Sequence, residues 1–212
     1  MTSIAAQRSA LRKQLRQRRR NLTKPQQQAA ARGLLRQLKK QPLFTRSRHI
    51  ALYLPADGEI DPTPIVKAAW RLGKQCYLPV LQPGKDNRLW FIRYRPNTPL
   101  VKNRFGIFEP QPHYRKAFSA KCLDLVLLPL VGFDDFGGRM GMGGGFYDRT
   151  FAFKRDSNAA LSPPYLLGLA HDCQRVDQLA LASWDIPLNA IATDQRVIMN
   201  PISDAKRSFI HP

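Results

Sequence analysis

Cysteines, acidic residues and long apolar runs are all scarce in this 212-residue sequence. The three cysteines, Cys76, Cys122 and Cys173, form no Cys-x-x-Cys pair, which excludes a disulfide scaffold and a zinc ribbon and favours a reducing compartment. No apolar run approaches the length of about 20 residues that a membrane-spanning helix needs. We therefore expect a cytoplasmic protein with no membrane partner.

The shortage of acidic residues is most extreme near the N-terminus. The whole chain has 34 Lys or Arg against 15 Asp or Glu, a net charge of +19, and residues 1–56 hold 14 of the basic residues and no acidic one. Such a charge implies anionic partners without identifying them. The composition of this segment is shared by mitochondrial transit peptides and by nucleic-acid-binding arms, so both alternatives must be weighed.

The basic segment nevertheless carries organised helical signals. Its apolar residues recur at intervals of seven and four, which gives one apolar seam: Ile4, Leu11, Leu15 and Leu22. Residues 23–26 read Thr-Lys-Pro-Gln, which resembles a capping box with proline in the first turn of a second helix. Pro42 ends that helix. We expect residues 1–41 to form a basic helix pair packed on the body of a single domain, residues 1–212.

After residue 48 the sequence has a series of short apolar runs, and an amphipathic helix is expected at 61–71 between the first two of them. The expected strands are His49–Leu54, Gln75–Val80, Leu89–Tyr94, Asp124–Leu128, Leu166–Ala170 and Ala190–Thr193. This alternation predicts an α/β fold, a three-layer domain with a mostly parallel central sheet flanked by helices. Ligands of such sheets gather beyond the carboxyl ends of the strands. His171, which follows one of these runs, is the one histidine we retain as a pocket candidate.

A glycine-dense segment follows the buried strand at 124–128. Between residues 128 and 151 it has seven glycines: Gly132, Gly137, Gly138, Gly141, Gly143, Gly144 and Gly145. Glycine lets backbone amides approach a ligand closely, and a helix start after the loop adds to the attraction for an anion such as phosphate. The segment has no Lys-Ser or Lys-Thr, so it is not a Walker A loop, and no complete Gly-x-Gly-x-x-Gly follows its strand.

Three side chains flank these glycines with chemistry that suits a nucleotide. Arg139 offers a planar cation to a phosphate oxygen, Tyr147 offers an aromatic wall, and Asp148 offers a carboxylate to Mg²⁺. The alternative is a surface loop with an incidental arginine, but the fixed order of arginine, glycines, aromatic pair and aspartate disfavours it. Asp134 and Asp135 compete as metal ligands, and a turn or cap role is the simpler expectation for both.

The run from Pro129 to Asp148, with its Gly-Arg-Met-Gly and Gly-Gly-Gly-Phe-Tyr-Asp, closely resembles the signature of the 5-formyltetrahydrofolate cyclo-ligase family, also called 5,10-methenyltetrahydrofolate synthetases. The resemblance is tight over residues 129–148 and looser over most of the chain. Two residues depart from the family pattern. Phe146 stands where a tyrosine is usual, and Gly144 stands where some members have a lysine, which removes one candidate phosphate ligand.

The resemblance implies a nucleotide site in which Arg139 is also the catalytic residue. Two arginines of the first helix, four residues apart and so on one face, match a basic pair that reaches the ATP phosphates in the family. The ATP-binding residues implied are Arg8, Arg12, Arg139, Gly141, Gly143, Gly144, Gly145, Phe146 and Tyr147. The carboxylates implied for Mg²⁺ are Asp148 and Asp185.

The resemblance also implies a folate pocket. Its residues would be Leu54, Glu59, Phe105, Met142, Gly143, Gly144, Gly145 and Phe146. Glu59 would accept hydrogen bonds from ring N–H groups of the pterin. Leu54 and Phe105 would form apolar walls, although core packing is the simpler explanation for both.

The reaction implied is the ATP- and Mg²⁺-dependent conversion of 5-formyltetrahydrofolate to 5,10-methenyltetrahydrofolate, with release of ADP and phosphate. The folate could carry a polyglutamate tail, which a basic surface would attract. Two alternatives remain open at this point. One is a basic nucleic-acid-binding protein, which would leave the 139–148 run unexplained. The other is an ATP-dependent ligase or kinase with a different substrate.

Overall fold

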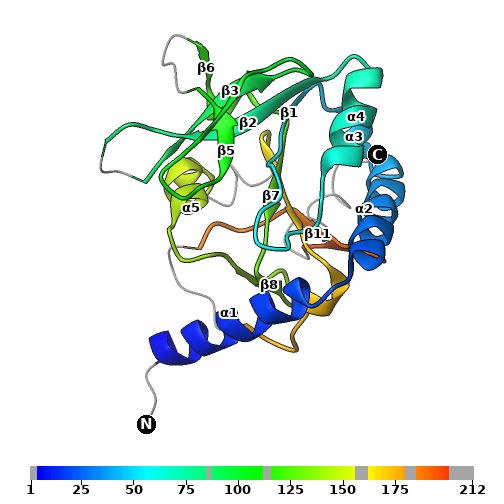
Figure 1. Cartoon of the computed structure of the whole chain (residues 1–212), viewed down its shortest axis with the longest axis vertical. Coiled ribbons are helices and arrows are strands. Elements are labelled where there is room, and N and C mark those ends of the chain that lie inside the picture. The colour runs from blue at the N-terminus through cyan, green and yellow to red at the C-terminus, as the bar shows by residue number, and fades with distance from the viewer. Residues whose placement is uncertain (1–3, 85–86, 112–115, 156–161, 180–184, 201–212) are drawn as a thin grey trace, which may run out of the picture.

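An eight-stranded sheet forms the centre of the protein, and the longest helices lie to one side of it and below it (Figure 1). The computed structural model describes residues 4–84, 87–111, 116–155, 162–179 and 185–200. The helices are α1 (Ile4–Arg20), α2 (Lys24–Lys39), α3 (Pro42–Arg46), α4 (Thr63–Arg71) and α5 (Phe146–Thr150). Short 3-10 turns occur at Ala120–Cys122 (η2), Ala152–Lys154 (η3) and Asp172–Gln174 (η4).

The central sheet has the order β12-β11-β10-β7-β1-β2-β3-β6. Its strands are β1 (His49–Ala51), β2 (Gln75–Leu81), β3 (Leu89–Tyr94), β6 (Ala117–Phe118), β7 (Leu125–Pro129), β10 (Tyr165–Leu169), β11 (Ala190–Ala192) and β12 (Val197–Met199). The strands from β11 to β2 pair in parallel, whereas β12, β3 and β6 are antiparallel to their neighbours. The expected α/β class with a mostly parallel sheet is confirmed.

Two small hairpins stand apart from this sheet. One joins β4 (Leu100–Lys102) to β5 (Phe108–Pro110), and the other joins β8 (Gly132–Phe133) to β9 (Arg139–Met140). Neither was expected, because strands of two or three residues give no periodic signal. The expected strand at His49–Leu54 is shorter in the structure, ending at Ala51. The residues that follow it, 54–59, form a loop at the carboxyl edge of the sheet, here called the 54–59 loop.

Apolar side chains cover both faces of the sheet, as the continuous apolar strands require. On one face, Leu34 and Leu38 of α2 and Ile65 of α4 pack over Ile50 of β1. On the other face, Val126 and Leu128 of β7 pack with Phe133, Phe151 and Ile191. The segments carrying α5 and η3 cover this second face.

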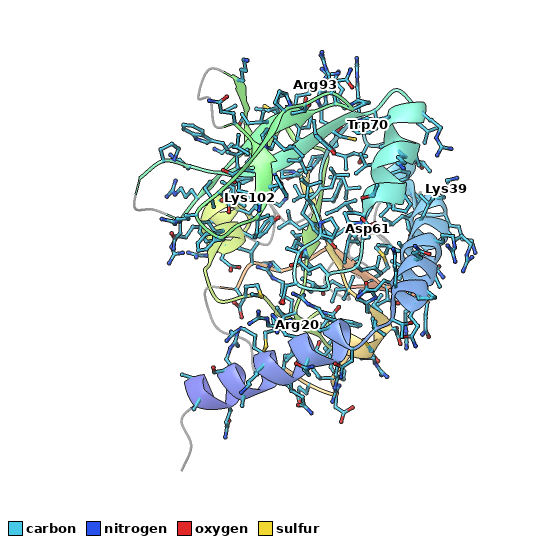
Figure 2. All side chains as sticks on the ribbon, viewed as in Figure 1. Arg20, Lys39, Asp61, Trp70, Arg93 and Lys102 are labelled. Carbon is cyan, nitrogen blue, oxygen red and sulfur yellow. The ribbon has the colours of Figure 1, made fainter. Side chains whose placement is uncertain are left out.

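The basic N-terminal segment does form two helices. The capping box at Thr23 is confirmed, since the Thr23 hydroxyl accepts from the Gln26 amide and the Gln26 side chain accepts from the Thr23 amide. Leu15 of α1 is fully buried with Val131 and Met140, so α1 packs under the carboxyl edge of the sheet. Figure 2 shows Arg20 at the end of α1 near the body of the protein, while Lys39 lies on the outer side of α2.

Among the described residues, none of the helices combines the length and the apolar character needed to cross a membrane. The cytoplasmic location inferred from the cysteines stays a prediction.

Candidate nucleotide and folate site

The first half of the glycine-dense segment is a hairpin, not a ligand loop. Gly132 belongs to β8, and Gly137 and Gly138 lie in the turn between β8 and β9. The carboxylate of Asp134 accepts hydrogen bonds from the amides of Phe136 (3.0 Å) and Gly138 (2.7 Å), which closes this turn. Asp134 therefore has the turn role expected for it. Arg139 is therefore the first residue of β9, and its side chain projects from backbone that the hairpin holds in place.

The second half, residues 141–145, is the glycine loop proper. Gly143 and Gly145 have φ angles of +95° and +66°, which strain any residue with a Cβ. Gly141, Met142 and Gly143 are exposed, so this part of the loop is accessible to a ligand. The helix that follows, α5, has only five residues. The expected contribution of a helix dipole is thus small, and the argument for an anion site depends on the loop and its arginines.

Arg139 and Asp148 form an ion pair beside this loop. The Arg139 guanidinium donates to a carboxylate oxygen of Asp148, and the same oxygen accepts from the Ile186 amide at 3.3 Å. Nε of Arg139 is buried and has no hydrogen-bond partner within the described part of the chain. An unsatisfied buried donor costs about 1–3 kcal/mol. A ligand oxygen at this position would remove that cost, so the environment of Arg139 suits a phosphate group.

Helix α1 brings Arg12 to the glycine loop and Arg8 to Asp185, each from more than 120 residues away in the sequence. Nε of Arg12 donates to the carbonyl oxygen of Gly141 at 2.9 Å, and its guanidinium lies next to Gly143. Burial lowers the pKa of Arg12, and the charges of Arg8 and Arg16 lower it further. Arg8 lies 3.6 Å from the Asp185 carboxylate. The two arginines predicted to bind phosphate therefore meet the predicted loop and the second predicted metal ligand.

The two predicted metal ligands lie close together. Asp185 directly precedes Ile186, whose amide contacts Asp148. No cluster of three or more His, Cys, Asp or Glu side chains with metal-binding geometry occurs among the described residues. Mg²⁺ needs no such cluster, because it commonly takes one or two carboxylates and completes its shell with phosphate oxygens and water. Asp148 and Asp185 fit that pattern in number and chemistry.

Glu59 lies in a buried and charged environment on the 54–59 loop. One of its carboxylate oxygens accepts from the Ala56 amide at 3.1 Å, and the other lies 3.7 Å from Nη2 of Arg19. Burial raises the pKa of Glu59 to about 7, and the charge of Arg19 and the Ala56 amide oppose that rise. Glu59 is therefore poised between its ionised and protonated forms near neutral pH.

Tyr147 follows the glycine loop as the second residue of α5. Burial raises the pKa of its phenol, the charge of Glu59 raises it further, and Arg139 lowers it. The resemblance assigned Tyr147 to the nucleotide and Glu59 to the folate, and the phenol of Tyr147 responds to the charges of both Glu59 and Arg139.

The predicted apolar walls occupy different surroundings. The ring of Phe105 is 57% exposed and meets the ring of Phe146 edge-on, with centroids 5.9 Å apart. Met142 is also exposed. Leu54, in contrast, is half-buried and packs against the core beneath α2 and α4. Phe105, Phe146 and Met142 thus offer apolar surface at the glycine loop, whereas the contacts of Leu54 are those of a core residue.

Several residues at the site gave no recognisable signal in the sequence. The carbonyl of Gly144 accepts from Nη1 of Arg149 at 2.7 Å and from Nδ2 of Asn87 at 3.3 Å. Arg104 in turn donates to Asn87. A cation therefore stands beside Gly144 although that residue lacks the lysine of some family members. Only the position of Arg149 directly after Asp148 could have suggested it.

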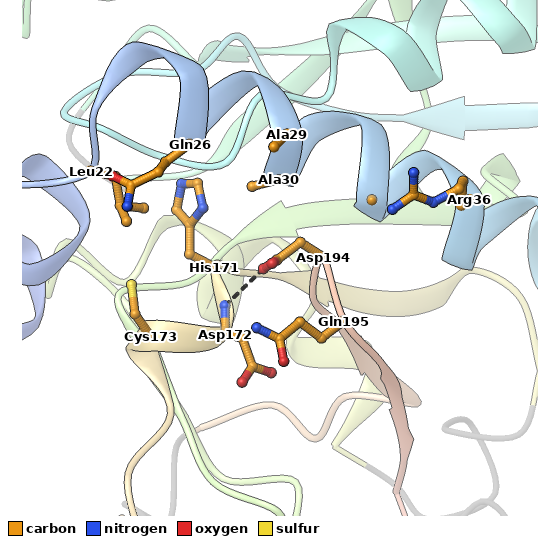
Figure 3. Close-up of a pocket in the computed structure, with 11 residues that line it drawn as sticks. Leu22, Gln26, Ala29, Ala30, Arg36, His171, Asp172, Cys173, Asp194 and Gln195 are labelled. Atoms are coloured by element: carbon orange, nitrogen blue, oxygen red, sulfur yellow. Dashed lines mark hydrogen bonds between the residues drawn. The ribbon is translucent and has the colours of Figure 1, made fainter.

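His171 lines a separate pocket of about 430 Å³ under α2, together with Gln26, Asp194 and Cys173 (Figure 3). Burial lowers the pKa of His171, and its Nε2 lies 3.2 Å from the carbonyl of Gly58. The pocket is on the α2 side, away from the glycine loop. The placement of His171 next to a pocket is as expected, but this is not the pocket of the predicted substrate site.

Comparison with known proteins gives one consistent result. A model of the 5-formyltetrahydrofolate cyclo-ligase family matches residues 4–194. The 5-formyltetrahydrofolate cyclo-ligase of Escherichia coli strain K12 is 42% identical over 183 residues, which are 86% of this chain and 98% of that protein. The protein of the same name from Haemophilus influenzae is 39% identical over 181 residues, 85% of this chain and 94% of that one.

Among solved structures, the 5,10-methenyltetrahydrofolate synthetase of Aquifex aeolicus superposes with a TM-score of 0.77 at 29% identity. The superposition covers 92% of this chain and 93% of that chain. The likeness therefore extends over both the N-terminal helices and the sheet.

Proposed function

Since this chain belongs to the 5-formyltetrahydrofolate cyclo-ligase family, we propose that it converts 5-formyltetrahydrofolate to 5,10-methenyltetrahydrofolate with consumption of ATP. The observation that carries the proposal is the family match over residues 4–194, joined to the convergence of Arg12, Arg139 and Asp148 at the glycine loop. The alternative of a ligase or kinase with another substrate is not favoured by either observation.

The chemistry requires an amide oxygen to become a leaving group. The formyl oxygen attacks the γ-phosphorus of ATP and the bond to ADP breaks, which leaves a phosphate on that oxygen. The N10 nitrogen then attacks the formyl carbon and loses its proton, and inorganic phosphate departs with the oxygen to give the methenyl bridge. Phosphoryl transfer of this kind needs alignment and charge neutralisation more than a protein nucleophile.

The arginines supply the charge neutralisation in this proposal. Nε of Arg139 is a buried donor with no hydrogen-bond partner among the described residues, so it would gain a hydrogen bond from a phosphate oxygen. Arg12 holds the glycine loop through the Gly141 carbonyl and keeps its remaining N–H groups for the ligand. The exposed amides at Gly141 and Gly143 complete the anion site.

Mg²⁺ would be held by Asp148 and Asp185, and when bound it would neutralise charge on the β- and γ-phosphates. Each of these carboxylates is paired with a proposed phosphate ligand, Asp148 with Arg139 and Asp185 with Arg8. With the magnesium complex of ATP bound, Asp148 and Asp185 would hold the metal, and Arg139 and Arg8 would be released from these ion pairs to bind phosphate oxygens. Either ligand alone leaves one member of each pair without a countercharge, so we expect ATP and Mg²⁺ to bind cooperatively.

The folate would bind with its ring system at Glu59 and its aryl portion along Phe105 and Phe146. The ionised Glu59 carboxylate accepts hydrogen bonds from the pterin N–H groups. Tyr147, whose phenol responds to the charges of both Glu59 and Arg139, would contact the reacting formyl group and the nucleotide. A polyglutamate tail would then lead past Arg104 toward solvent.

The test is a spectroscopic assay of the purified protein. 5-Formyltetrahydrofolate, ATP and Mg²⁺ should give the near-ultraviolet absorbance of the methenyl product, with one ADP formed per product. Omitting ATP should abolish the signal. Formation of ADP without methenyl product when other carboxylate or amide substrates are supplied would instead favour the alternative ligase or kinase.

A further inference from the structure

One arginine at the site is buried in a way the reaction itself does not require. Arg19 is 0% exposed, the largest fully buried side chain among the described residues. A guanidinium is almost never fully buried unless its charge and its donors are satisfied. The hydrogen bonds and the ion pair of Arg19 therefore indicate what role the buried side chain has.

Those contacts join three separate segments. Nε donates to the carbonyl of Asp57 at 2.8 Å, Nη2 donates to the Asp57 carboxylate at 2.9 Å, and Nη1 donates to the carbonyl of Leu130 at 3.2 Å. Asp57 follows β1 and Leu130 follows β7, which are neighbours in the sheet. From these two strands the chain proceeds in opposite directions along the sheet, to β2 and to β10. Arg19 thus lies at the topological switch point, the usual ligand position in such sheets.

Asp57 is the centre of this arrangement. Its carboxylate also pairs with Arg16 and Arg20 of α1. Burial alone would raise the pKa of Asp57, but hydrogen bonds from Arg16, Arg20 and Arg19 hold it at about 2. The next residue, Gly58, has a φ of +74°, and a Cβ there would lie 3.2 Å from the carbonyl of Arg19. The 54–59 loop is therefore fitted closely against the end of α1.

Arg19 reaches Glu59 as well. Its Nη2 lies 3.7 Å from Oε1 of Glu59, too far for a hydrogen bond but close enough for strong charge attraction. The other oxygen is held by the Ala56 amide. Oε1 therefore keeps its lone pairs free of the Arg19 donors while its charge is stabilised. This is the state a carboxylate needs to accept hydrogen bonds from a ligand ring.

We propose that Arg19 is a positioning residue for the folate half of the site, fixing the 54–59 loop at this switch point and keeping Glu59 oriented and ionised for the substrate ring. The proposal rests on the folate-binding role of Glu59 proposed above. It separates the work of α1 into two parts: Arg8 and Arg12 serve the nucleotide, and Arg19, two turns further on, serves the folate.

The charged groups around Glu59 determine how removal of Arg19 should change the pKa of Glu59. Arg19 of α1 is the cation that favours ionisation, whereas Asp57 of the same loop and burial oppose it. The phenols of Tyr53, after β1, and Tyr147, of α5, also feel the charge of Glu59. Without Arg19, protonation of Glu59 should move to higher pH, and folate binding should weaken most at low pH.

The experiment compares Arg19→Met, which keeps the length of the side chain, with Arg20→Met as a matched control. Arg20 pairs with the same Asp57 but is 47% exposed, and it is not among the groups that shift the pKa of Glu59. We expect Arg19→Met to weaken 5-formyltetrahydrofolate binding, measured by calorimetry without ATP, about tenfold or more at pH 7. Its KM for ATP should change less than about twofold, and Arg20→Met should change neither by more than about twofold.

A merely structural role predicts a different pattern. If folate and ATP binding weaken equally in Arg19→Met, or if folate binding is unchanged, the proposal is wrong. A double-mutant cycle with Glu59→Gln adds an independent readout: the effect of Arg19→Met should shrink to about twofold in the Glu59→Gln background, since the two residues act on one ligand group. Full additivity would also overturn the proposal.

If Arg19→Met does not fold by circular dichroism, Arg19→Lys decides. Lysine keeps the positive charge but cannot make the hydrogen bonds of the guanidinium to both Asp57 and Leu130. Folate binding should therefore weaken about threefold, with the KM for ATP unchanged. Unchanged folate binding would refute the positioning role. The wild-type protein separates this inference from the function itself. Wild-type protein that fails to bind 5-formyltetrahydrofolate overturns both, whereas binding that Arg19 variants leave intact overturns only this one.

Discussion

Near the glycine loop, Asp148 and Asp185 are paired with arginines that could bind phosphate instead. At the 54–59 loop, the carboxylate of Asp57 is paired with several arginines of α1, and Arg19 also donates to backbone carbonyls. Asp148 pairs with Arg139 and Asp185 pairs with Arg8, and both carboxylates remain partly exposed. Asp57 has three arginine partners, and one of them is fully buried. The first arrangement can exchange partners when a ligand arrives, and the second cannot without losing packing.

This difference matches what the two ligands demand. A nucleotide with its metal brings four or more charges, and a site that holds replaceable ion pairs can accept them without leaving buried charges unpaired. A pterin brings neutral N–H groups, which need an acceptor held in one place. The following predictions test whether the ion pairs at the glycine loop are replaceable while those at the 54–59 loop are fixed.

The largest effect should come from Arg139. Arg139→Ala removes the buried donor and the countercharge for the transferred phosphoryl group, so kcat/KM should fall by about 10³-fold or more. The assay is methenyl formation under saturating folate. Arg175→Ala is the control, because Arg175 forms a similar ion pair with Asp135 on the surface. Equal losses in both variants, or full activity of Arg139→Ala, would contradict the phosphate role.

Asp148→Asn should lower kcat by about 10²-fold at a fixed Mg²⁺ concentration, because one metal ligand loses its charge. The partner-exchange idea makes a sharper statement. Asp148→Asn leaves Arg139 without its ion pair, so ATP in the absence of Mg²⁺ should bind at least as tightly as to the wild type, and added Mg²⁺ should improve binding much less. Titration calorimetry with and without the metal measures both. Weaker metal-free ATP binding in the variant would argue against partner exchange.

The folate end should show a pH dependence that the nucleotide end lacks. The pKa of Glu59 is about 7 in the folded protein against an ordinary value of 4.5. If binding requires the carboxylate, 1/KM for folate should fall as the pH drops through 7, by up to about tenfold per pH unit below it. Glu59→Gln should flatten this profile. A wild-type profile that is already flat from about pH 6 to 8 would remove Glu59 from the binding role.

The same pKa has the opposite consequence for folding. The folded state holds the Glu59 proton more tightly than the unfolded state, so this group adds to stability as the pH falls from about 7 toward 4.5. Thermal unfolding of wild type and Glu59→Gln across this range separates the effect of Glu59 on stability from its effect on binding.

The smallest effect concerns the backbone of the glycine loop. Gly143→Ala should destabilise the protein by about 1–2 kcal/mol, because alanine resists the φ of +95°, and it should raise the KM for ATP several-fold by displacing the loop from Arg12. Gly141→Ala is the matched control: its φ is ordinary and a Cβ there would meet nothing within 4 Å. Denaturant unfolding and steady-state kinetics test the pair. Equal behaviour of the two variants would show that the shape of the loop is not required.

The sequence predicted correctly those features that depend on interactions between residues close together in the chain. The β3 boundaries, the Thr23 capping box and the α/β class followed from periodicity and turn chemistry. The short hairpins were missed because two-residue strands have no period, and the helix after the glycines proved too short to matter electrostatically. The family resemblance selected Arg12, which contacts the glycine loop in the structure, and Glu59, and the roles of both remain predictions.

The amino-acid sequence by itself determined which chemical groups this protein has: a glycine loop with an arginine before it and an aspartate after it, and an N-terminal helix lined with arginines. Only the tertiary structure decided which of those arginines serve which task. Arg12 and Arg19 look alike in the sequence, and both lie on α1. One reaches the exposed glycine loop while the other is buried at the switch point of the sheet, because packing of Leu15 under the sheet edge sets the rotation of α1 and thus the surroundings of every charge on it.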